Sequence, residues 1–317
     1  MNFRNLLMWG LIVLLSVGLF NLFQNPNRVD AQSNKIAFSK FLQEVDNGRV
    51  VEVEIQGNGP RFRLRELNVQ DYPHIEWAEP TGGIKIFGRD FLPAVSRVGV
   101  ASATDEARPT LTGVLFESQD DALRLVATDS YRLAVCQIPG SPGVATTLVP
   151  FRALRELNRT IGDDNMALNL REREAVFSSP RGALSARVIE ADFPNYRQLL
   201  PESYPNKIVL DKGSLLEALG RASLVAEEHI PVRLTLHSGG VELSVSRQEV
   251  GEETEHLDGV YTGEDMTIAF NTKYLTDGVA AVTSDDVVLE ASDPLKPGLI
   301  TGEGDGSFRY LLMPVRL

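Results

Sequence analysis

Cysteine is nearly absent from this sequence, which has one, Cys136, in 317 residues. A single cysteine excludes an intramolecular disulfide framework and a metal site built from paired cysteines. Cys136 follows an apolar stretch, Leu133 to Val135, in a strand-like run, so we expect a small buried side chain and not a reactive thiol. This composition suits a reducing compartment.

Positive charge and histidine are also scarce. Lys and Arg total 31 against 43 Asp and Glu, which gives a formal net charge of −12 and a pI near 4.9. A protein that is basic overall is thereby excluded, so any nucleic-acid site has to be local. The four histidines lack the spacing of metal ligands, and none completes a nucleophile relay with the Asp and Ser of ATDS (127–130). We expect no catalytic residue, no metal and no cofactor.

Long hydrophobic runs are limited to LLMWGLIVLLSVGLFNLF at residues 6–23, which carries no charge. As a helix it would be roughly 27 Å long and would just span the hydrocarbon core of a bilayer. We predict a transmembrane helix over 6–23, within a membrane anchor and spacer at 1–33. A signal peptide cleaved near VDAQS (29–33) is the alternative. An anchor with its amino terminus in the cytoplasm would place the rest of the chain outside.

Residues 34–57 follow with a helix, a glycine turn and an alternating strand, predicted from KIAFSKFLQEVDNGRVVEVEIQGN (35–58). This opening resembles the start of the FtsH family of membrane-anchored metalloproteases. The matching residues are Ile36, Phe38, Ser39, Phe41, Leu42, Val45, Gly48, Val50, Val53 and Ile55. The resemblance covers only residues 1–57. Neither a Gly-Lys-Ser/Thr phosphate loop nor a His-Glu-x-x-His helix follows, so protease activity is not implied.

From residue 81 the sequence repeats a pattern with a period of roughly 120 residues, which suits duplicated domains. Residues 81–201 and 202–317 each predict a strand and helix, alternating strands, a second strand and helix, and a closing strand pair. The expected fold class is α+β, with antiparallel sheets and two helices on one face in each module. Residues 58–80 end in QDYP, similar to EADFP (190–194), and look like the remnant and linker of an earlier module.

Several motifs in this part resemble the bacterial β sliding clamp family, the processivity subunit of DNA polymerase III. They are RPTLTGVLFE (108–117), LVATDSYRLAV (125–135), ADFPNYRQLLP (191–201), IAFNTKYL (268–275), SDPLKP (292–297) and YLLMPVRL (310–317). The resemblance implies a DNA-clamp fold in which a ring of modules encloses double-stranded DNA. It also implies partners, DNA polymerase III and clamp-loader subunits, that dock through short apolar peptides.

Complete members of this family have three modules and close as a head-to-tail dimer, whereas only modules two and three are whole here. We therefore expect a truncated or chimeric clamp, and a monomer or weak self-association in place of a stable ring. Clamp function implies a cytoplasmic location, which conflicts with an anchor at 6–23. The alternatives are an anchored extracytoplasmic interaction protein that reuses the clamp fold, and a gene-fusion artefact.

Candidate DNA contacts come from arginines on the helices that line the hole in this family. The helix after Pro150 carries Arg152, Arg155 and Arg159 on one face. Such a face is usually only solvated, but the resemblance favours contact with phosphates. The other candidates are Arg89, Arg97, Arg221 and Lys273, with Arg108 as a weaker one.

The resemblance also implies a peptide pocket between the two modules. Its lining would be Leu111, Thr128, Tyr131, Arg132, Leu133, Pro194, Leu199, Asn271, Tyr274, Leu295, Pro297, Met313, Pro314, Val315, Arg316 and Leu317. Such a groove suits an extended peptide with apolar anchors. Ser130 and Tyr131 stand where many members have Gly-His, which we expect to shift ligand preference. Ordinary core packing is the alternative for Leu133 and for the neighbouring Leu311.

Overall fold

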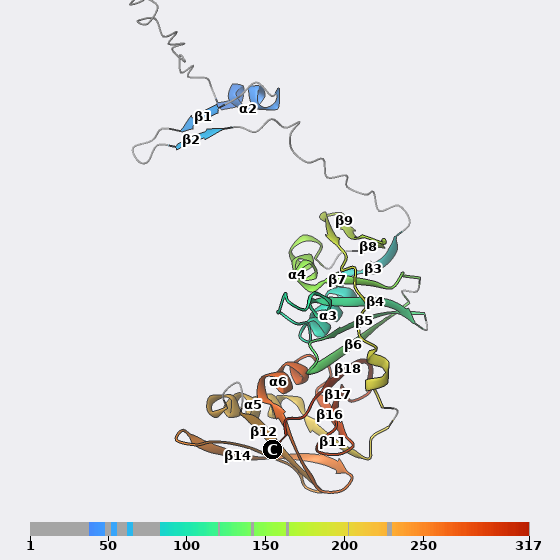
Figure 1. Cartoon of the computed structure of the whole chain (residues 1–317), viewed down its shortest axis with the longest axis vertical. Helices are drawn as coiled ribbons and strands as arrows, with labels where there is room; N and C mark the ends of the chain where they lie inside the picture. Colours follow the sequence, from blue (N-terminus) through green and yellow to red (C-terminus); the bar gives the residue numbers. More distant parts are fainter. Residues whose placement is uncertain are drawn as a thin grey trace, which may run out of the picture. The chain divides into compact units, whose positions relative to one another are not determined.

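The computed structural model describes residues 38–47, 52–55, 62–65, 83–119, 121–140, 143–162, 165–201, 203–226 and 230–316. The chain divides into two compact units, Met1–Glu76 and Trp77–Leu317. Figure 1 shows the helices and strands of both units, coloured along the sequence.

The first unit contains helix α2 (Phe38–Asp46) and strands β1 (Glu52–Ile55) and β2 (Phe62–Arg65). The strands form an antiparallel pair, with Glu52 opposite Arg65 and Ile55 opposite Phe62. The helix and first strand confirm the pattern predicted for 35–58. Their hairpin joins residues on both sides of the boundary expected after residue 57.

The apolar run at 6–23, the spacer to residue 33 and residues 66–80 lie outside the described part of the chain. Among the helices that are described, none is long and apolar enough to cross a membrane.

The second unit consists of two modules whose elements follow in the same order, which confirms the repeat. Module two contains β3 (Ile84–Phe87), α3 (Gly88–Gly99), the short helix η2 (Pro109–Thr112), β4 (Gly113–Gln119), β5 (Ala122–Thr128), β6 (Arg132–Pro139), β7 (Thr147–Pro150), α4 (Phe151–Thr160), β8 (Asn165–Leu170), β9 (Glu174–Ser179) and β10 (Gly182–Arg187). A linker with helix η3 (Tyr196–Leu199) leads to module three.

Module three contains β11 (Asn206–Asp211), α5 (Lys212–Val225), β12 (Pro231–His237), β13 (Gly240–Arg247), β14 (Gly251–Thr262), β15 (Met266–Asn271), α6 (Thr272–Ala280), β16 (Asp286–Ala291), β17 (Gly298–Gly302) and β18 (Asp305–Leu312). Each module therefore has two α-helices and antiparallel strands, as predicted.

The helices form where apolar residues recur at helical spacing. In α3 the predicted face is buried, with Phe91, Leu92, Val95 and Val98 each at most 7% exposed. Side chains cap both helices of module three. Asp211 accepts a hydrogen bond from the Ser214 amide (2.7 Å), and Asn271 accepts one from the Tyr274 amide (3.0 Å). These caps fix where α5 and α6 begin.

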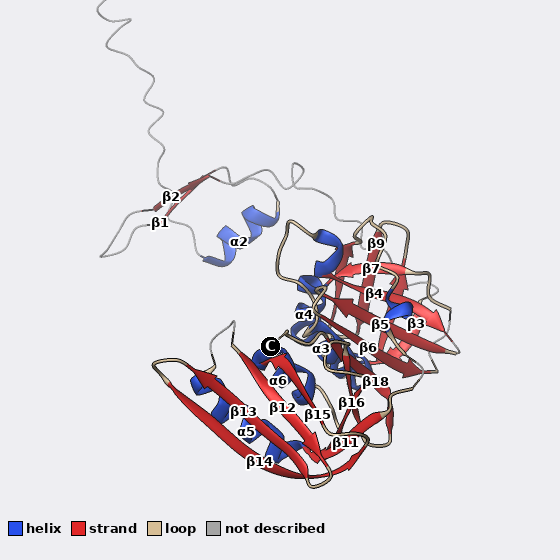
Figure 2. Ribbon diagram, turned by 60° about the horizontal axis from the view of Figure 1, so that its bottom comes forward, coloured by secondary structure: helices blue, strands red, loops and turns tan. Residues whose placement is uncertain are grey.

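Backbone pairing fuses the two modules. A twelve-stranded sheet runs in the order β15-β12-β13-β14-β11-β16-β17-β18-β6-β5-β4-β7, and a separate four-stranded sheet in the order β10-β9-β8-β3. The pairing between β18 and β6, from Phe308 opposite Cys136 to Leu312 opposite Arg132, joins the modules. We call this contact the seam. Figure 2 shows β6 and β18 side by side where the strands of the two modules meet.

Side chains alternate across strands β4 to β6, so the sheet contributes to two cores. On one face Phe116 packs with Phe91 and Phe177, with ring centroids 6.0 to 6.4 Å apart. On the other face a smaller core lies beneath the linker and contains Leu115, Val126, Leu133, Val135, Leu148, Tyr196, Leu299 and Leu311. Leu133 and Leu311 are thus core residues, as the packing alternative predicted.

Candidate peptide site and candidate DNA-contact helix

The chain end crosses the seam after β18. The Met313 amide donates a hydrogen bond to the Tyr131 carbonyl (2.9 Å), which belongs to module two. Two residues later the Val315 amide donates to the Ala269 carbonyl (2.8 Å) of module three. Residues 313–316 therefore lie across both modules, and Leu317 falls outside the described residues.

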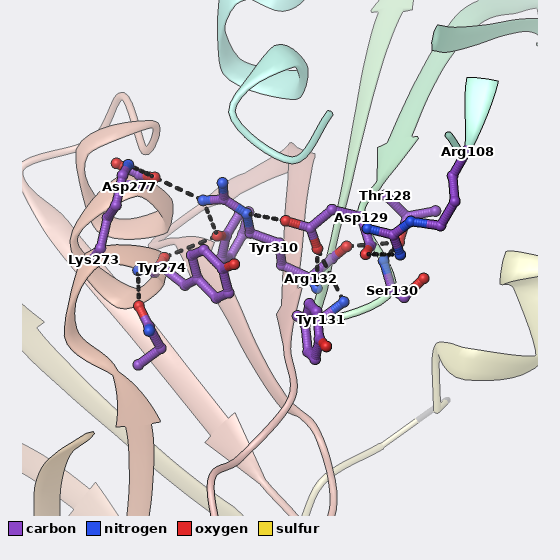
Figure 3. Close-up of polar contacts among 11 residues, drawn as sticks. Arg108, Thr128, Asp129, Ser130, Tyr131, Arg132, Lys273, Tyr274, Asp277 and Tyr310 are labelled. Carbon is purple, nitrogen blue, oxygen red and sulfur yellow. Dashed lines mark hydrogen bonds and ion pairs between the residues drawn. The ribbon is translucent and has the colours of Figure 1, made fainter. Parts of the chain in front are cut away.

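Arg132 is the centre of a polar network beneath this segment (Figure 3). Its side chain is 8% exposed, and its Nε donates to Asp129 Oδ2 at 2.9 Å. Its Nη1 donates to Asp277 Oδ2 of α6 at 2.6 Å, and its guanidinium lies 4.2 Å from the centroid of the Tyr274 ring. Burial works to lower the pKa of Arg132, but Tyr310, Asp277 and Asp129 outweigh it and raise the pKa. The arginine stays charged and bridges the two modules.

Tyr310 connects this network to the backbone of α6. Its hydroxyl donates to the Tyr274 carbonyl (2.8 Å) and accepts a hydrogen bond from Arg132 Nη1 (3.4 Å). Burial raises the pKa of Tyr310, so its hydroxyl stays protonated. Lys273 Nζ pairs with Asp277 at 2.7 Å from the outer side. Figure 3 shows these side chains converging from β6, β18 and α6.

The predicted peptide-site residues fall into two classes. Leu111, Thr128, Arg132 and Leu133 are buried, at 9% exposure or less, and support the surface from below. Asn271 serves as the cap of α6. Four apolar side chains are exposed instead: Tyr131 (58%), Leu199 (49%), Leu295 (66%) and Met313 (43%). The Tyr131 and Tyr274 rings lie 6.3 Å apart. Pro194 and Arg316 are exposed, and Pro297, Pro314 and Val315 are half-buried.

Sequence reasoning missed Asp129, Asp277 and Tyr310. Asp129 also accepts hydrogen bonds from the amides of Tyr131 (2.9 Å) and Arg132 (3.0 Å), which shapes the β5–β6 turn. A short polar residue before a turn is a known signal for such bonds, so TDSY (128–131) could have pointed to Asp129. Asp277 and Tyr310 lie 145 and 178 positions from Arg132, and no local pattern predicts those contacts.

The arginines of α4 lie as the periodicity predicted. Arg152, Arg155 and Arg159 are exposed, while Leu154 and Leu157 are buried on the opposite side. Arg152 is 3.8 Å from Glu106 and Arg159 is 3.4 Å from Glu156, and both arginine side chains are at least 80% exposed. These ion pairs are loose and solvated, so the arginines can exchange them for other anions.

The other candidate cations are more varied. Arg89 is exposed and lies 4.6 Å from the Phe87 ring centroid. Arg108 pairs with Asp105 at 3.2 Å, Lys273 with Asp277 at 2.7 Å, and Arg221 with Glu255 at 2.7 Å. The amide of Ala107 and the side chain of Arg108 lower the pKa of Asp105.

Arg97 differs from the rest and requires a correction. Its side chain is 14% exposed, because it lies over the Phe308 ring at 4.4 Å. Its Nε donates to the Ala281 carbonyl (2.8 Å) and its Nη2 to Asp305 (2.9 Å), both in module three. Arg97 is therefore a structural residue of the seam and not part of an exposed cationic face.

Family models match three parts of the chain. The central domain of the DNA polymerase III beta subunit matches residues 86–195, and its C-terminal domain matches residues 197–316. FtsH Extracellular matches residues 6–76. The first two matches follow the two repeated modules, and the third overlaps the first compact unit.

Similar proteins are sliding clamps. The Beta sliding clamp of Streptomyces coelicolor is 32% identical over 316 residues, covering 91% of this chain and 84% of the relative. That of Synechocystis sp. is 30% identical, covering 83% and 73%. Among solved structures, the Caulobacter crescentus beta sliding clamp gives a TM-score of 0.76 at 27% identity, covering 84% of this chain and 73% of that one. The Pseudomonas aeruginosa DNA polymerase III subunit beta gives 0.76 at 26%, covering 84% and 75%. By these likenesses the chain belongs to the beta sliding clamp family.

Proposed function

We propose that this chain works as a DNA sliding clamp, holding double-stranded DNA and docking DNA polymerase III and clamp-loader subunits without catalysing a reaction. The observation that carries the proposal is the fusion of two complete clamp modules, residues 81–201 and 202–317, through the seam. The similarity to sliding clamps of known structure supports it. In this proposal residues 34–57 are FtsH-like, and residues 58–76 belong with them because the FtsH Extracellular match continues to residue 76. A remnant of a first clamp module at 58–80 is the alternative.

For DNA, the proposal assigns the phosphate contacts to the exposed arginines of α4. A clamp has to slide, so its contacts are to phosphates and not to base edges. Arg89 and Arg108 are additional exposed candidates. Arg221 and Lys273 would first have to leave their carboxylate partners, so we expect them to contribute less.

The test is the salt dependence of binding to a duplex oligonucleotide, measured by fluorescence anisotropy. Replacing Arg152, Arg155 and Arg159 by Gln together should weaken binding and reduce the slope of log K against log salt by about 3. The matched control replaces the exposed Arg171, Arg173 and Arg233 by Gln. Equal effects of the two triple variants would contradict the assignment to α4.

For partner proteins, the proposal assigns docking to the surface formed by Tyr131, Tyr274, Leu199, Leu295 and residues 313–316, and predicts that Leu317 contributes as well. Exposed apolar side chains suit an extended peptide with hydrophobic anchors, and Met adapts to several of them. A Pseudomonas aeruginosa sliding clamp has been solved with griselimycin bound, so a related clamp does take a ligand.

Titration of a labelled clamp-motif peptide tests this site. Leu295→Ala and Tyr131→Ala should each weaken binding at least tenfold, and deletion of residues 313–317 should abolish it. Leu224→Ala is the control, because Leu224 is 82% exposed but lies on α5. Unchanged affinity in the site variants, with the fold intact by circular dichroism, would show that the site is misassigned.

A second candidate function rests on the FtsH Extracellular match at residues 6–76. It is a membrane-anchored interaction protein, held by residues 6–23, that carries the clamp fold outside the cytoplasm. Protease protection of intact cells separates the two: a clamp acting on DNA has residues 81–317 in the cytoplasm. Sequencing genomic DNA across codons 50–90 tests whether the junction between the FtsH-like and clamp segments is a genuine chimera or a fusion artefact.

A further inference from the structure

The two modules have equivalent strands, and this identifies equivalents of the seam. The seam pairs the last strand of module three, β18, with the fourth strand of module two, β6. Counted in the same way, the last strand of module two is β10 and the fourth strand of module three is β14. A second contact of the same type would therefore join β10 to β14.

Both of these strands have an edge without a strand partner among the described residues. β10 pairs only with β9 and is the outermost strand of its sheet. β14 pairs with β13 from Gly251 to Asp258 and turns to β11 only from Gly259 onward. Its other edge over 251–258 is thus left without a strand. An open edge of this kind is a template for pairing with another chain.

The two edges carry opposite charge. The β13–β14 turn and the start of β14 hold Glu249, Glu252, Glu253 and Glu255. The turn before β10 holds Arg181, and β10 ends on the exposed Arg187. Two β14 edges, or two β10 edges, would repel each other because their charges have the same sign. A β14 edge facing a β10 edge instead brings glutamates close to arginines. Charge complementarity therefore favours a second copy of this chain, bound through unlike edges.

The register of the seam shows which charged residues of β14 and β10 would lie near each other. Pairing along the hairpins makes Gly251 to Glu255 equivalent to Arg132 to Cys136, and Gly182 to Ala186 equivalent to Phe308 to Leu312. Copying the seam sets Glu252 opposite Ser185. Arg187 then lies two residues further along the same face of β10, diagonal to Glu252 and within reach of its long side chain.

Arg221 adds an independent contact. It is the tenth residue of α5, as Arg97 is the tenth residue of α3. Arg97 donates to the carbonyl of Ala281, the C-cap of α6. The equivalent acceptor for Arg221 is the carbonyl of Ile161, the C-cap of α4, in a second copy. Arg221 is half exposed, and to reach this carbonyl it would exchange its solvated ion pair with Glu255.

We propose that β14 of one copy pairs with β10 of a second copy in the register of the seam, so that Glu252 meets Arg187. The contact joins unlike surfaces, so it propagates to a closed ring or an open chain. It revises the expectation of a monomer or weak assembly, which rested on the lack of identified matching faces. It depends on the fold alone and not on DNA or peptide binding.

Charge reversal in the full-length chain tests the contact, with the size of assemblies read by native mass spectrometry over a concentration series in mild detergent. We expect the wild type to associate, and Arg187→Glu or Glu252→Arg alone to weaken association at least tenfold. The double variant, with both charges exchanged, should restore it. Arg233→Glu and Glu303→Arg are controls on exposed residues away from both edges.

Three results would overturn the proposal. They are a wild-type chain that stays single up to about 100 μM, where complexes with micromolar or lower Kd are assembled; assemblies that neither reversal changes; or a double variant that fails to recover. Thermal unfolding of each variant, followed by circular dichroism, confirms that altered association does not reflect a damaged fold.

Discussion

Arg97 and Arg221 occupy the same place in the two modules but have different surroundings. Arg97 is 14% exposed and fixed by a carbonyl, a carboxylate and an aromatic ring of the neighbouring module. Arg221 is 50% exposed, and its ion-pair partners among the described residues are carboxylates of its own module, Glu255 and Glu217. The repeat therefore determines where a side chain lies, and the neighbouring module determines what it contacts.

The strands show the same contrast. At the seam, Ala134 of β6 lies opposite Tyr310 and is fully buried. At the equivalent position of β14 stands Glu253, whose carboxylate oxygens are shielded from solvent and have no hydrogen-bond partner among the described residues. One strand is built for a partner already present, and the other carries charge on an open edge.

Removing Arg132 should have the largest effect, because it removes the buried charged bridge at one end of the seam. Arg132→Ala leaves Asp129 and Asp277 without their buried cation, and we expect the free energy of unfolding to fall by about 3–5 kcal/mol. Urea denaturation measures the change. Arg233→Ala, on the exposed face of β12, should leave stability nearly unchanged. A loss no larger than that of the control would show that the network does not hold the modules together.

The variants Arg97→Ala and Arg221→Ala test whether contact with the neighbouring module gives Arg97 the larger contribution to stability. Loss of the charged hydrogen bond to Asp305 and of the bond to Ala281 should cost about 2 kcal/mol for Arg97. Arg221→Ala should give little change, because its ion pairs are exposed and solvated. Equal losses from the two variants, by the same denaturation assay, would mean that the neighbouring module does not make the difference.

Asp305 gives the seam a pH dependence. Burial works to raise its pKa, but Ser307, Arg97 and Thr283 outweigh it and hold the pKa at about 2. The folded-state pKa is below the unfolded value, so this stabilisation is complete above about pH 4 and is lost as the pH falls toward 2. Asp305→Asn should remove about 2 kcal/mol at pH 7 and flatten the acid limb of the stability curve. An unchanged acid limb would contradict the assignment.

Glu253 should change stability with pH in the opposite direction to Asp305. Burial and the neighbouring Glu255 raise its pKa, so the ionised form is disfavoured in the folded state. This cost is absent below the unfolded pKa of about 4.3 and grows as the pH rises through it. Glu253→Gln should therefore raise the melting temperature modestly at pH 7 and not at pH 4. Ala134→Gln, at the equivalent seam position, should lower it at both.

The smallest expected effect is at the turns before β6 and β14. Ser130 and Glu249 have φ values of 82° and 70°, in the left-handed region that disfavours side chains. Ser130→Gly and Glu249→Gly should each stabilise the chain by up to about 1 kcal/mol. Similar gains would indicate that the turns, unlike the strands they lead into, are equivalent in the two modules.

Local patterns were enough to predict the repeat, the fold class and the outward face of α4, because periodicity reports which side of an element is buried. They did not separate Arg97 from Arg155, since both are arginines at helical spacing. Asp305 lies 208 positions after Arg97, and only the fold brings them together. The peptide site divided in the same way. Its exposed apolar residues could be read from the motifs, whereas the contacts of Arg132 with Asp277 and Tyr310 join distant parts of the chain.

Cys136 lies in β6 directly opposite Phe308, buried, with its pKa raised by burial to about 11. The only thiol of the chain is therefore covered by the contact between the modules. Its rate of alkylation reports how often that contact opens, as hydrogen exchange does for amides. Separation of the modules without unfolding would expose this sulfur while the helices keep their circular dichroism signal. The chain thus carries a natural chemical probe of its own domain undocking.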